Sequence, residues 1–443
     1  MRIPGPEPRT DGGVGAVTEA GGLHHYQLRL HAEYGPVVRF QLPGAETAVS
    51  VADPVLLEAT AHIDKRPERL FEFLAPLCEA GNLQVIGADE HTPWRRVLLS
   101  VLAGRPSHER HFGRFTELAT ALADDWAARA DGEPVELQKD LTALTLRMIS
   151  EYALGGDGDL ADPDRVIAAF EEVLTEYLGR LYQVPVPGTQ DERARRAEEA
   201  LAFLRATVDR VVAAHRSGGR ADKSDLIGAL IEAGESPARI RDTVMVTMLA
   251  AHHTTGVAVS WTLHLLARHP DAATRVADEL DRVLGERAAP EYADLRRLTY
   301  LEMALKESMR LYPPGPYGAR ETTEPLVLGD YEIPAGATIF YPFWAVHLNP
   351  AYWPEPEKFV PERFTPEETA KRPRLAYIPF GLGPRSCEGA ALAMVEAELV
   401  LAVLLKRFRF RPAPGRETVT PIERFVLWAA DDIRMLVSDR HSA

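Results

Sequence analysis

A long and almost uninterrupted apolar helix in the middle of the chain limits the fold more than any other feature. Between Thr243 and Leu266 few residues are charged, and the apolar residues are not confined to one stripe of the helix. A helix that is apolar on nearly every face is stable only inside a large protein, where other elements cover it. Ser236 can cap this helix and His269–Pro270 can end it. The sequence therefore predicts a large core around a helix over Ser236–His269.

Most of the remaining chain has the spacing of amphipathic helices, with apolar residues three and four positions apart. The predicted helices cover Glu109–Ala130, Asp140–Leu154, Asp162–Tyr182, Asp191–Arg216, Pro270–Leu284, Thr299–Leu311 and the stretch from Cys387 to about Phe408. Strand patterns are short. The predicted strands form a β-hairpin over Tyr34–Val51 and lie at Leu326–Leu328, Tyr331–Ile333, Thr338–Tyr341 and Ile422–Leu427. We expect a mainly α fold with small peripheral β-sheets, as one domain over residues 31–443 after a loosely ordered N-terminal arm over residues 1–30.

Composition narrows the classes of function. The 443 residues include 50 Lys and Arg against 65 Asp and Glu, a net charge of −15. Nucleic acid is not an expected partner, because phosphate binding needs clustered positive charge. No apolar run approaches the ~18 residues of a membrane span, and the first twenty residues lack the apolar run of a signal peptide. We therefore expect a cytoplasmic protein without a transmembrane segment.

Cys387 lies in a setting that favours chemistry over structure. The chain has only one other cysteine, Cys78, so neither a disulfide framework nor an all-cysteine zinc site is expected. Cys387 sits in the glycine-rich run Phe380–Gly389, directly before a long predicted helix, whose N-terminus favours a thiolate. The glycines allow the backbone to approach a bulky ligand. A buried cysteine at a tight turn is the alternative, but the full pattern Phe-x-x-Gly-x-Arg-x-Cys-x-Gly favours a metal-ligating thiolate.

This pattern resembles the haem-binding signature of the cytochrome P450 family, and further segments agree with the family in order. Glu307 and Arg310 match its Glu-x-x-Arg pair on one face of a helix, and Arg363 in Pro361–Phe364 matches the residue that completes a structural triad. The resemblance implies the P450 fold, with haem b between the central helix and the helix after Cys387, its iron ligand. The implied haem-contacting residues are His91, Arg95, Arg320, Phe380, Gly381, Arg385 and Gly389. For the segment of His91 a solvated basic helix start is the alternative.

The middle of the central helix also resembles the family. Residues 250–255 read Ala-Ala-His-His-Thr-Thr, where the family usually has Ala/Gly-Gly-x-Asp/Glu-Thr-Thr/Ser. The resemblance implies that Thr254, flanked by His253 and Thr255, steadies dioxygen and helps to pass protons. His253 replaces the usual acid, and an imidazole can relay protons near pH 7. A metal site of His252 with His253 is not expected, because adjacent helical side chains point ~100° apart, so His252 is expected in the core.

The resemblance implies a monooxygenase that uses O2 to oxidise a hydrophobic small molecule of terpenoid, fatty acid, steroid or polyketide type in specialised metabolism. It implies electrons from NAD(P)H through a separate ferredoxin and ferredoxin reductase. We expect Arg385, Lys406, Arg407 and Arg409 to steer an acidic ferredoxin, and we expect a monomer. A peroxide-driven peroxygenase and a haem-thiolate binding or sensor protein without turnover remain alternatives.

Substrate contacts are expected from apolar and aromatic side chains, since small-molecule sites are mostly apolar. Taken alone, each such residue more often belongs to the ordinary core than to a pocket. The expected pocket residues are Phe71, Phe73, Leu74, Tyr177, Tyr182, Met245, Met248, Leu249, Tyr317 and Phe425.

Overall fold

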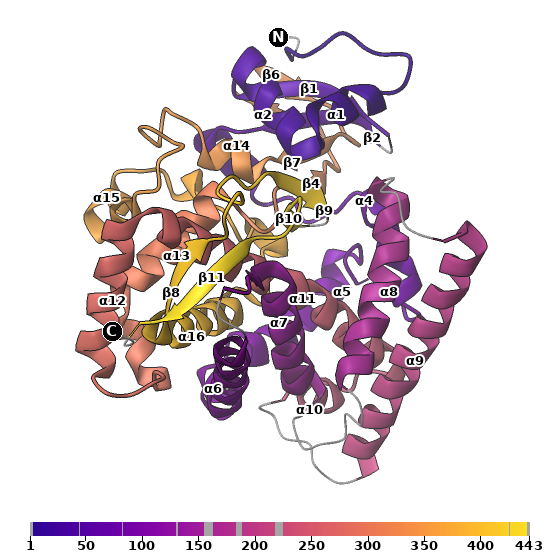
Figure 1. Cartoon of the computed structure of the whole chain (residues 1–443). Coiled ribbons are helices and arrows are strands. Elements are labelled where there is room, and N and C mark those ends of the chain that lie inside the picture. The colour runs from indigo at the N-terminus through magenta and orange to yellow at the C-terminus, as the bar shows by residue number, and fades with distance from the viewer. Residues whose placement is uncertain are drawn as a thin grey trace.

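Helices dominate the computed structural model, which describes residues 3–43, 45–81, 83–129, 132–154, 163–182, 188–217, 225–424 and 426–440 (Figure 1). The α-helices are α1 (Val14–Ala20), α2 (Leu23–Tyr34), α3 (Pro54–Thr60), α4 (Glu68–Phe71), α5 (Ala88–Leu102), α6 (Arg105–Ala128), α7 (Leu137–Leu154), α8 (Pro163–Tyr182), α9 (Gln190–Ser217), α10 (Leu226–Glu232), α11 (Pro237–Arg268), α12 (Pro270–Leu284), α13 (Thr299–Leu311), α14 (Phe343–His347), α15 (Pro366–Ala370) and α16 (Ala390–Arg407). No helix in these described ranges is both long enough and apolar enough to cross a membrane.

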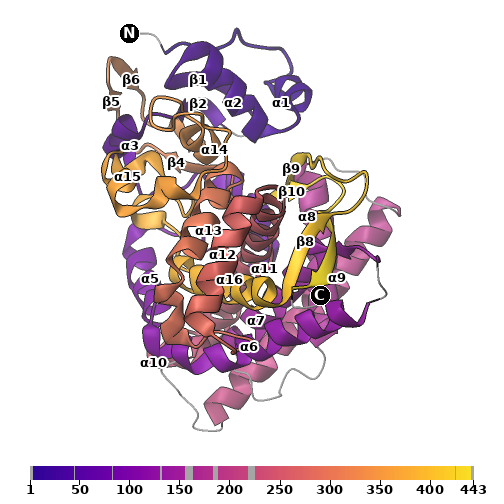
Figure 2. The same cartoon turned by 60° about the vertical axis from the view of Figure 1, so that its left-hand side comes forward.

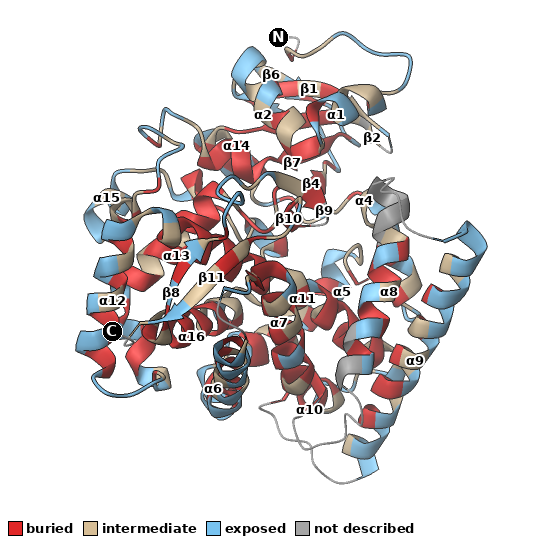
Figure 3. Cartoon of the chain, in the orientation of Figure 1, coloured by how far each residue is buried: buried red, intermediate tan, exposed pale blue. Residues whose placement is uncertain are grey.

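The central helix α11 runs through the core, as the sequence predicts. Ser236 caps it by accepting a hydrogen bond from the Arg239 N–H at 3.2 Å. It packs against α7, α9, α13 and α16, and Figure 2 shows α13 and α16 beside it. Gly256 permits the close approach of α7, because a Cβ there would lie 2.8 Å from the Thr142 nitrogen. The outer helices α6, α9 and α12 present exposed faces, whereas α11 is buried along most of its length (Figure 3).

The β-structure is small and peripheral. One sheet has the order β1 (Val37–Leu42), β2 (Ala45–Val51), β7 (Thr338–Tyr341), β4 (Gly318–Glu321), with β2 and β7 parallel and the other pairs antiparallel. The other strands are β3 (Val135–Glu136), β11 (Arg434–Asp439) and β8 (Phe408–Pro412) in one sheet, β5 (Leu326–Leu328) with β6 (Tyr331–Ile333), and β9 (Pro421–Arg424) with β10 (Val426–Ala429). The expected fold class, mainly α with small peripheral sheets, is confirmed.

Two local expectations are wrong. The N-terminal arm is not loose, because α1 and α2 form and the boundary expected at residue 30 falls inside α2. Leu23 and Leu30 of α2 are buried in the cluster that covers the first sheet, and Gly21, with φ +86°, ends α1. Glycines here end helices instead of signalling disorder. The range Ile422–Leu427, expected to be a single strand, is instead divided between two antiparallel strands, β9 and β10.

Candidate active site

The loop before α16 presents Cys387 through backbone geometry that needs glycine. The Cys387 N–H donates to the Phe380 carbonyl at 2.8 Å. Gly381 and Gly383 have φ of +75° and +68°, a region that other residues rarely adopt. At Gly383 a Cβ would lie 2.0 Å from the Ala61 carbonyl oxygen. Gly389 caps α16, and its N–H bonds the Cys387 thiol.

The anionic form of the Cys387 thiol is disfavoured in the protein alone. Burial raises the pKa of this thiol to about 11, and the charge of Glu388 acts in the same direction. The Gly389 N–H and the nearby Arg95 and Arg66 oppose the shift without cancelling it. The effect expected of the helix N-terminus is therefore opposed by desolvation.

A bound cation would compensate a buried thiolate. No group of three or more His, Cys, Asp or Glu side chains that could hold a metal occurs among the described residues. A metal on Cys387 must therefore obtain most of its ligands from something other than these side chains. The donor set, one thiolate without protein co-ligands, fits the iron of a porphyrin.

Two of the arginines expected to contact haem lie beside this loop and pair with carboxylates. Arg385 Nε donates to Asp64 Oδ1 at 2.6 Å, and its Nη2 donates to Asp64 Oδ2 at 3.1 Å. Arg95 Nη1 donates to the Ser386 carbonyl at 2.6 Å and also pairs with Glu388. These pairs thus link the loop before α16 to Asp64 and to Arg95 of α5, which are far from it in sequence.

His91, Arg320 and Arg66 complete this group. His91 lies between the two carboxylates, 3.9 Å from Asp64 and 3.7 Å from Glu388. Arg320 Nη2 donates to the Leu382 carbonyl at 3.2 Å. Arg66 Nη2 donates to the Arg385 carbonyl at 3.2 Å. We call these five side chains, Arg66, His91, Arg95, Arg320 and Arg385, the cationic cradle.

The cationic cradle carries more charge than the protein neutralises. Its four arginines face two carboxylates, so two positive charges (4 − 2) are uncompensated. Burial, together with the field of Arg320, lowers the pKa of Arg66 to about 9. Buried guanidinium nitrogens of Arg66, Arg320 and Arg385 lack hydrogen-bond partners, which is costly unless an anion is bound. Haem carries two propionates, so the residues here fit a haem-thiolate protein.

The three residues of the expected triad are in contact. Arg310 Nε and Nη2 donate to the two oxygens of Glu307 at 2.7 and 2.8 Å, and both side chains are fully buried. Arg363 Nε lies 3.3 Å from Glu307 Oε1. Arg310 also donates to the carbonyls of His347 and Pro356. The group ties α13 to the irregular chain before α16.

The middle of α11 is partly accessible. Ala250 is exposed, whereas Leu249 and His252 are buried. The Thr254 hydroxyl donates back to the Ala250 carbonyl at 2.8 Å, as expected of a helical threonine. Thr255 is buried. The hydroxyl of Thr254 therefore adjoins the accessible part of this helix.

The neighbouring histidines do not point apart. The rings of His252 and His253 are stacked, with centroids 3.9 Å apart and planes at 24°, which differs from the divergence expected for adjacent helical residues. Stacked rings do not direct their nitrogens at one ion, and His252 is in the core as expected. Burial lowers the pKa of His253 to about 4, so its imidazole is neutral near pH 7.

The expected pocket residues fall into three groups. Leu74, Met245, Met248 and Leu249 are buried in the main core cluster, with Phe71 and Tyr177 packed against it. Tyr317 does not lie with them, because it packs against the cluster of the first sheet and donates to Glu423 Oε1 at 2.6 Å. Its hydroxyl anchors the side chain through this hydrogen bond, so Tyr317 does not serve as an apolar contact. The side chains of Phe73 and Tyr182, and the whole of Phe425, lie outside the described residues.

The expected patch for a ferredoxin is wrong in two of its four members. Arg385 is buried in the cationic cradle. Lys406 is also buried and donates to Asp281 and to the Gly285 carbonyl, both at 2.8 Å. Arg407 pairs with Asp124, and Arg409 is exposed. Charges counted along the sequence do not show which of them face solvent.

Sequence reasoning missed Arg66, Asp64 and Glu388. Arg66 and Asp64 lie in a short irregular segment without a recognisable motif, and Glu388 occupies a variable position of the cysteine motif. Within the motif the charges of Arg385 and Glu388 balance, so its composition gives no signal for these three residues.

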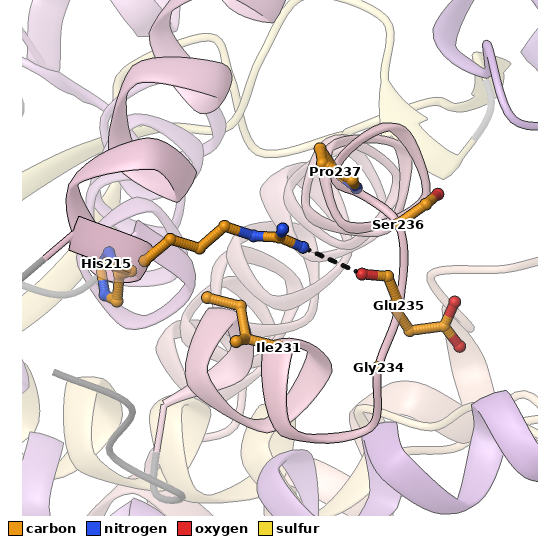
Figure 4. Close-up of a pocket in the computed structure, with 7 residues that line it drawn as sticks. His215, Ile231, Gly234, Glu235, Ser236 and Pro237 are labelled. Carbon is orange, nitrogen blue, oxygen red and sulfur yellow. Dashed lines mark hydrogen bonds between the residues drawn. The ribbon is translucent and has the colours of Figure 1, made fainter. Parts of the chain in front are cut away.

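A separate hollow at the N-terminal end of α11 has no part in this site. It has a volume of about 620 Å3 and lies between the ends of α9 and α10 and the start of α11. Figure 4 shows residues that line it, among them His215, Ile231 and Glu235, and Arg216 Nη2 donates to the Glu235 carbonyl at 3.1 Å. It contains none of the expected site residues.

Known proteins agree with this assignment of class. Residues 8–436 match the family model described as Cytochrome P450. Cyclooctatin synthase of Streptomyces melanosporofaciens is 33% identical over 75% of this chain and 74% of that protein. Cyclooctat-9-en-7-ol 5-monooxygenase of the same organism is 31% identical over 75% of this chain and 73% of that protein. The crystal structure of cytochrome P450DA heme domain matches 99% of this chain and 97% of that chain, with a TM-score of 0.88 and 26% identity.

The chain therefore belongs to the cytochrome P450 family. It is an oxidoreductase of the monooxygenase class, and membership of the family implies haem.

Proposed function

We propose that this monooxygenase binds haem through Cys387 and the cationic cradle and oxidises a hydrophobic small molecule near Thr254. The observation that carries the proposal is the pair of uncompensated charges beside a cysteine without protein co-ligands. Haem supplies the activation of O2 when it is bound. The protein holds its carboxylates, excludes water and positions the substrate.

Thr254 is suited to moving a proton at a defined atom. Its Oγ donates to the Ala250 carbonyl, so the same oxygen can accept a hydrogen bond from a water at the accessible part of α11. By changing partners the hydroxyl can pass a proton without acquiring charge. His253, neutral near pH 7, would act as a hydrogen-bonding neighbour rather than as an ionised acid.

The substrate in this proposal is of terpenoid, fatty acid, steroid or polyketide type. Leu74, Met245, Met248 and Leu249 offer apolar contact, and three of them lie within three turns of Thr254 on α11. A relative is named for cyclooctat-9-en-7-ol, by its name an unsaturated cyclic alcohol, which supports the terpenoid type. Screening hydrophobic compounds for a low-to-high-spin optical shift would identify ligands.

We further propose a cytoplasmic monomer in specialised metabolism that takes electrons from NAD(P)H through a ferredoxin and its reductase. The net charge of −15 supports a soluble monomer, and the exposed Arg409 supports contact with an acidic donor. Substrate oxidation driven by NAD(P)H and these two proteins supports the proposal. Oxidation with hydrogen peroxide alone would identify a peroxygenase, and binding without electron consumption a sensor.

The two cysteines provide the test of the ligand. Cys387→Ser is expected to abolish the carbon-monoxide absorption band of thiolate-ligated ferrous haem, and Cys78→Ser is expected to retain it. Cys78 lies in the segment before α5, where burial raises the pKa of its thiol to about 11, so it controls for the loss of a thiol. An unchanged band in the Cys387 variant would overturn the assignment.

A further inference from the structure

His253 is not held in place by a hydrogen bond at its buried ring nitrogen. Nδ1 is buried and has no hydrogen-bond partner. At Nδ1, therefore, no polar contact distinguishes the two possible orientations of the ring. Something else must fix the ring.

Aromatic contacts surround His253 on two sides. His252 stacks on one face, with centroids 3.9 Å apart. Trp428 of β10 lies at a centroid distance of 5.2 Å with its plane at 73°, an edge-to-face arrangement. Such pairs contribute about 0.5–1.5 kcal/mol beyond their area. His252 is the chain neighbour and moves with α11, so Trp428 is the contact that comes from another element.

The backbone of β10 is anchored on both sides of Trp428. The Leu427 carbonyl accepts from Trp261 Nε1 of α11 at 2.9 Å, and the Leu427 N–H donates to the Pro314 carbonyl at 2.9 Å. The Ala429 N–H donates to Gln138 Oε1 of α7 at 2.8 Å. These bonds fix the residue between them relative to α11.

The other strand of the hairpin is tied down as well. Glu423 of β9 accepts from His24 Nδ1 of α2 at 2.8 Å and from the Tyr317 hydroxyl at 2.6 Å. Ile422 pairs with Trp428 across the hairpin. The hydrogen bonds of both strands therefore anchor the backbone that carries Trp428 to α2, α7 and α11.

We propose that Trp428 is a positioning residue, which fixes the imidazole of His253 so that only one of its nitrogens can exchange a proton with the site at Thr254. The role in proton exchange at Thr254 rests on the proposed function, whereas the contact between Trp428 and His253 does not. Since Nδ1 is closed off, His253 cannot take a proton at one nitrogen and release it at the other. It holds or donates a single proton at Nε2. Proton transfer from solvent to the site must therefore pass through water or Thr254.

The first test measures the imidazole itself. We would titrate His253 by NMR in histidine-labelled protein in the diamagnetic ferrous carbon-monoxide form, with the resonance assigned by His253→Phe. In the parent protein no titration is expected between about pH 5.5 and 8. Trp428→Leu is expected to open the ring to water and raise the midpoint by one pH unit or more, while Trp428→Phe stays near the parent. An unchanged titration in Trp428→Leu would overturn the proposal.

Trp126 of α6 supplies a matched control, because it packs edge-to-face on Phe410 at 6.2 Å and donates to Asp140, and neither partner belongs to the β9–β10 hairpin. Trp126→Leu is expected to leave the His253 titration unchanged. A shift equal to that of Trp428→Leu would show a general loss of packing and would overturn the proposal. If Trp428→Leu does not fold, Trp428→Phe and Trp428→Met carry the comparison.

The second test asks whether Trp428 acts through His253. Introduced into the parent protein, Trp428→Leu is expected to increase the peroxide released per NAD(P)H consumed by about threefold or more. Introduced into the His253→Phe variant, the same substitution is expected to leave this ratio unchanged. Independent, additive effects would contradict the proposal. The NMR result does not depend on turnover, so a failure of the proposed monooxygenase reaction would remain distinguishable from a failure of this inference.

Discussion

Arg66 shows how single residues prepare this site for an anionic ligand. Its guanidinium is held among other arginines although burial lowers its pKa to about 9. Such an arrangement destabilises the protein alone. The unfavourable field becomes favourable once carboxylates lie beside it.

The corresponding prediction concerns haem retention. Arg66→Leu removes a charge-assisted contact worth about 1.5–3 kcal/mol, and haem transfer to an acceptor protein should become about 10- to 100-fold faster. Absorbance of the acceptor measures the rate. Arg69→Leu, at an exposed position three residues later, should leave the rate unchanged. Equal rates in the parent and Arg66→Leu would show that Arg66 does not contact the propionates.

The same residue marks the limit of sequence reasoning about the site. Cys387, Arg385 and Arg320 could be located because they fall in motifs with fixed spacing. Arg66 could not, because its role depends on a contact with a carbonyl 319 positions away. Long-range contacts of this kind leave no local pattern. The charge balance of the cationic cradle therefore became visible only in three dimensions.

At the scale of elements, long helices were predicted well because their apolar period repeats many times. Pro270–Leu284 and Thr299–Leu311 agree with α12 and α13 to the residue. Short elements offer few repeats, so α1 and the β9–β10 reversal were missed. The close contact of α11 with α7 was also invisible in the sequence, because a glycine inside a helix usually signals weakness rather than proximity.

That contact gives a prediction for two helical glycines. Gly256→Ala would place a Cβ 2.8 Å from the Thr142 nitrogen, which only a shift of α7 could relieve. Overpacking costs about 1–3 kcal/mol and outweighs the gain of about 1 kcal/mol in helix propensity, so the unfolding temperature should fall. Gly113→Ala in α6, where nothing lies within 4 Å, should raise it. A rise in both variants would contradict the close packing.

The whole molecule combines buried histidines and buried glutamates with opposite effects on stability. Burial lowers the pKa of His31, His253 and His264 to about 4 and that of His347 to about 3. Below pH 6.5 these histidines bind protons in the unfolded chain but stay neutral in the folded protein. The free energy of unfolding therefore falls with falling pH. Burial also raises the pKa of Glu396 and Glu398 to about 8.

The glutamates act in the other direction. Between pH 4.5 and 8 the unfolded chain has released protons that the folded protein keeps, so rising pH destabilises the fold. Since at least four histidines outweigh two glutamates below pH 6.5, the free energy of unfolding of the haem-bound protein should be largest near pH 6.5. Denaturant titrations across the range measure it. Glu396→Gln should halve the decline between pH 6.5 and 8, and an undiminished decline would exclude Glu396 as its cause.

The first sheet joins distant parts of the chain, since Ala48 pairs with Thr338, and the cationic cradle likewise spans Arg66 to Arg385. During synthesis on the ribosome, β2 emerges long before its parallel neighbour exists. A nascent chain that has not yet passed residue 338 cannot complete this sheet, and under the proposed function one that ends before residue 387 lacks the iron ligand. Cofactor loading would then follow the synthesis of residue 387, and translation products that stop earlier would remain free of haem.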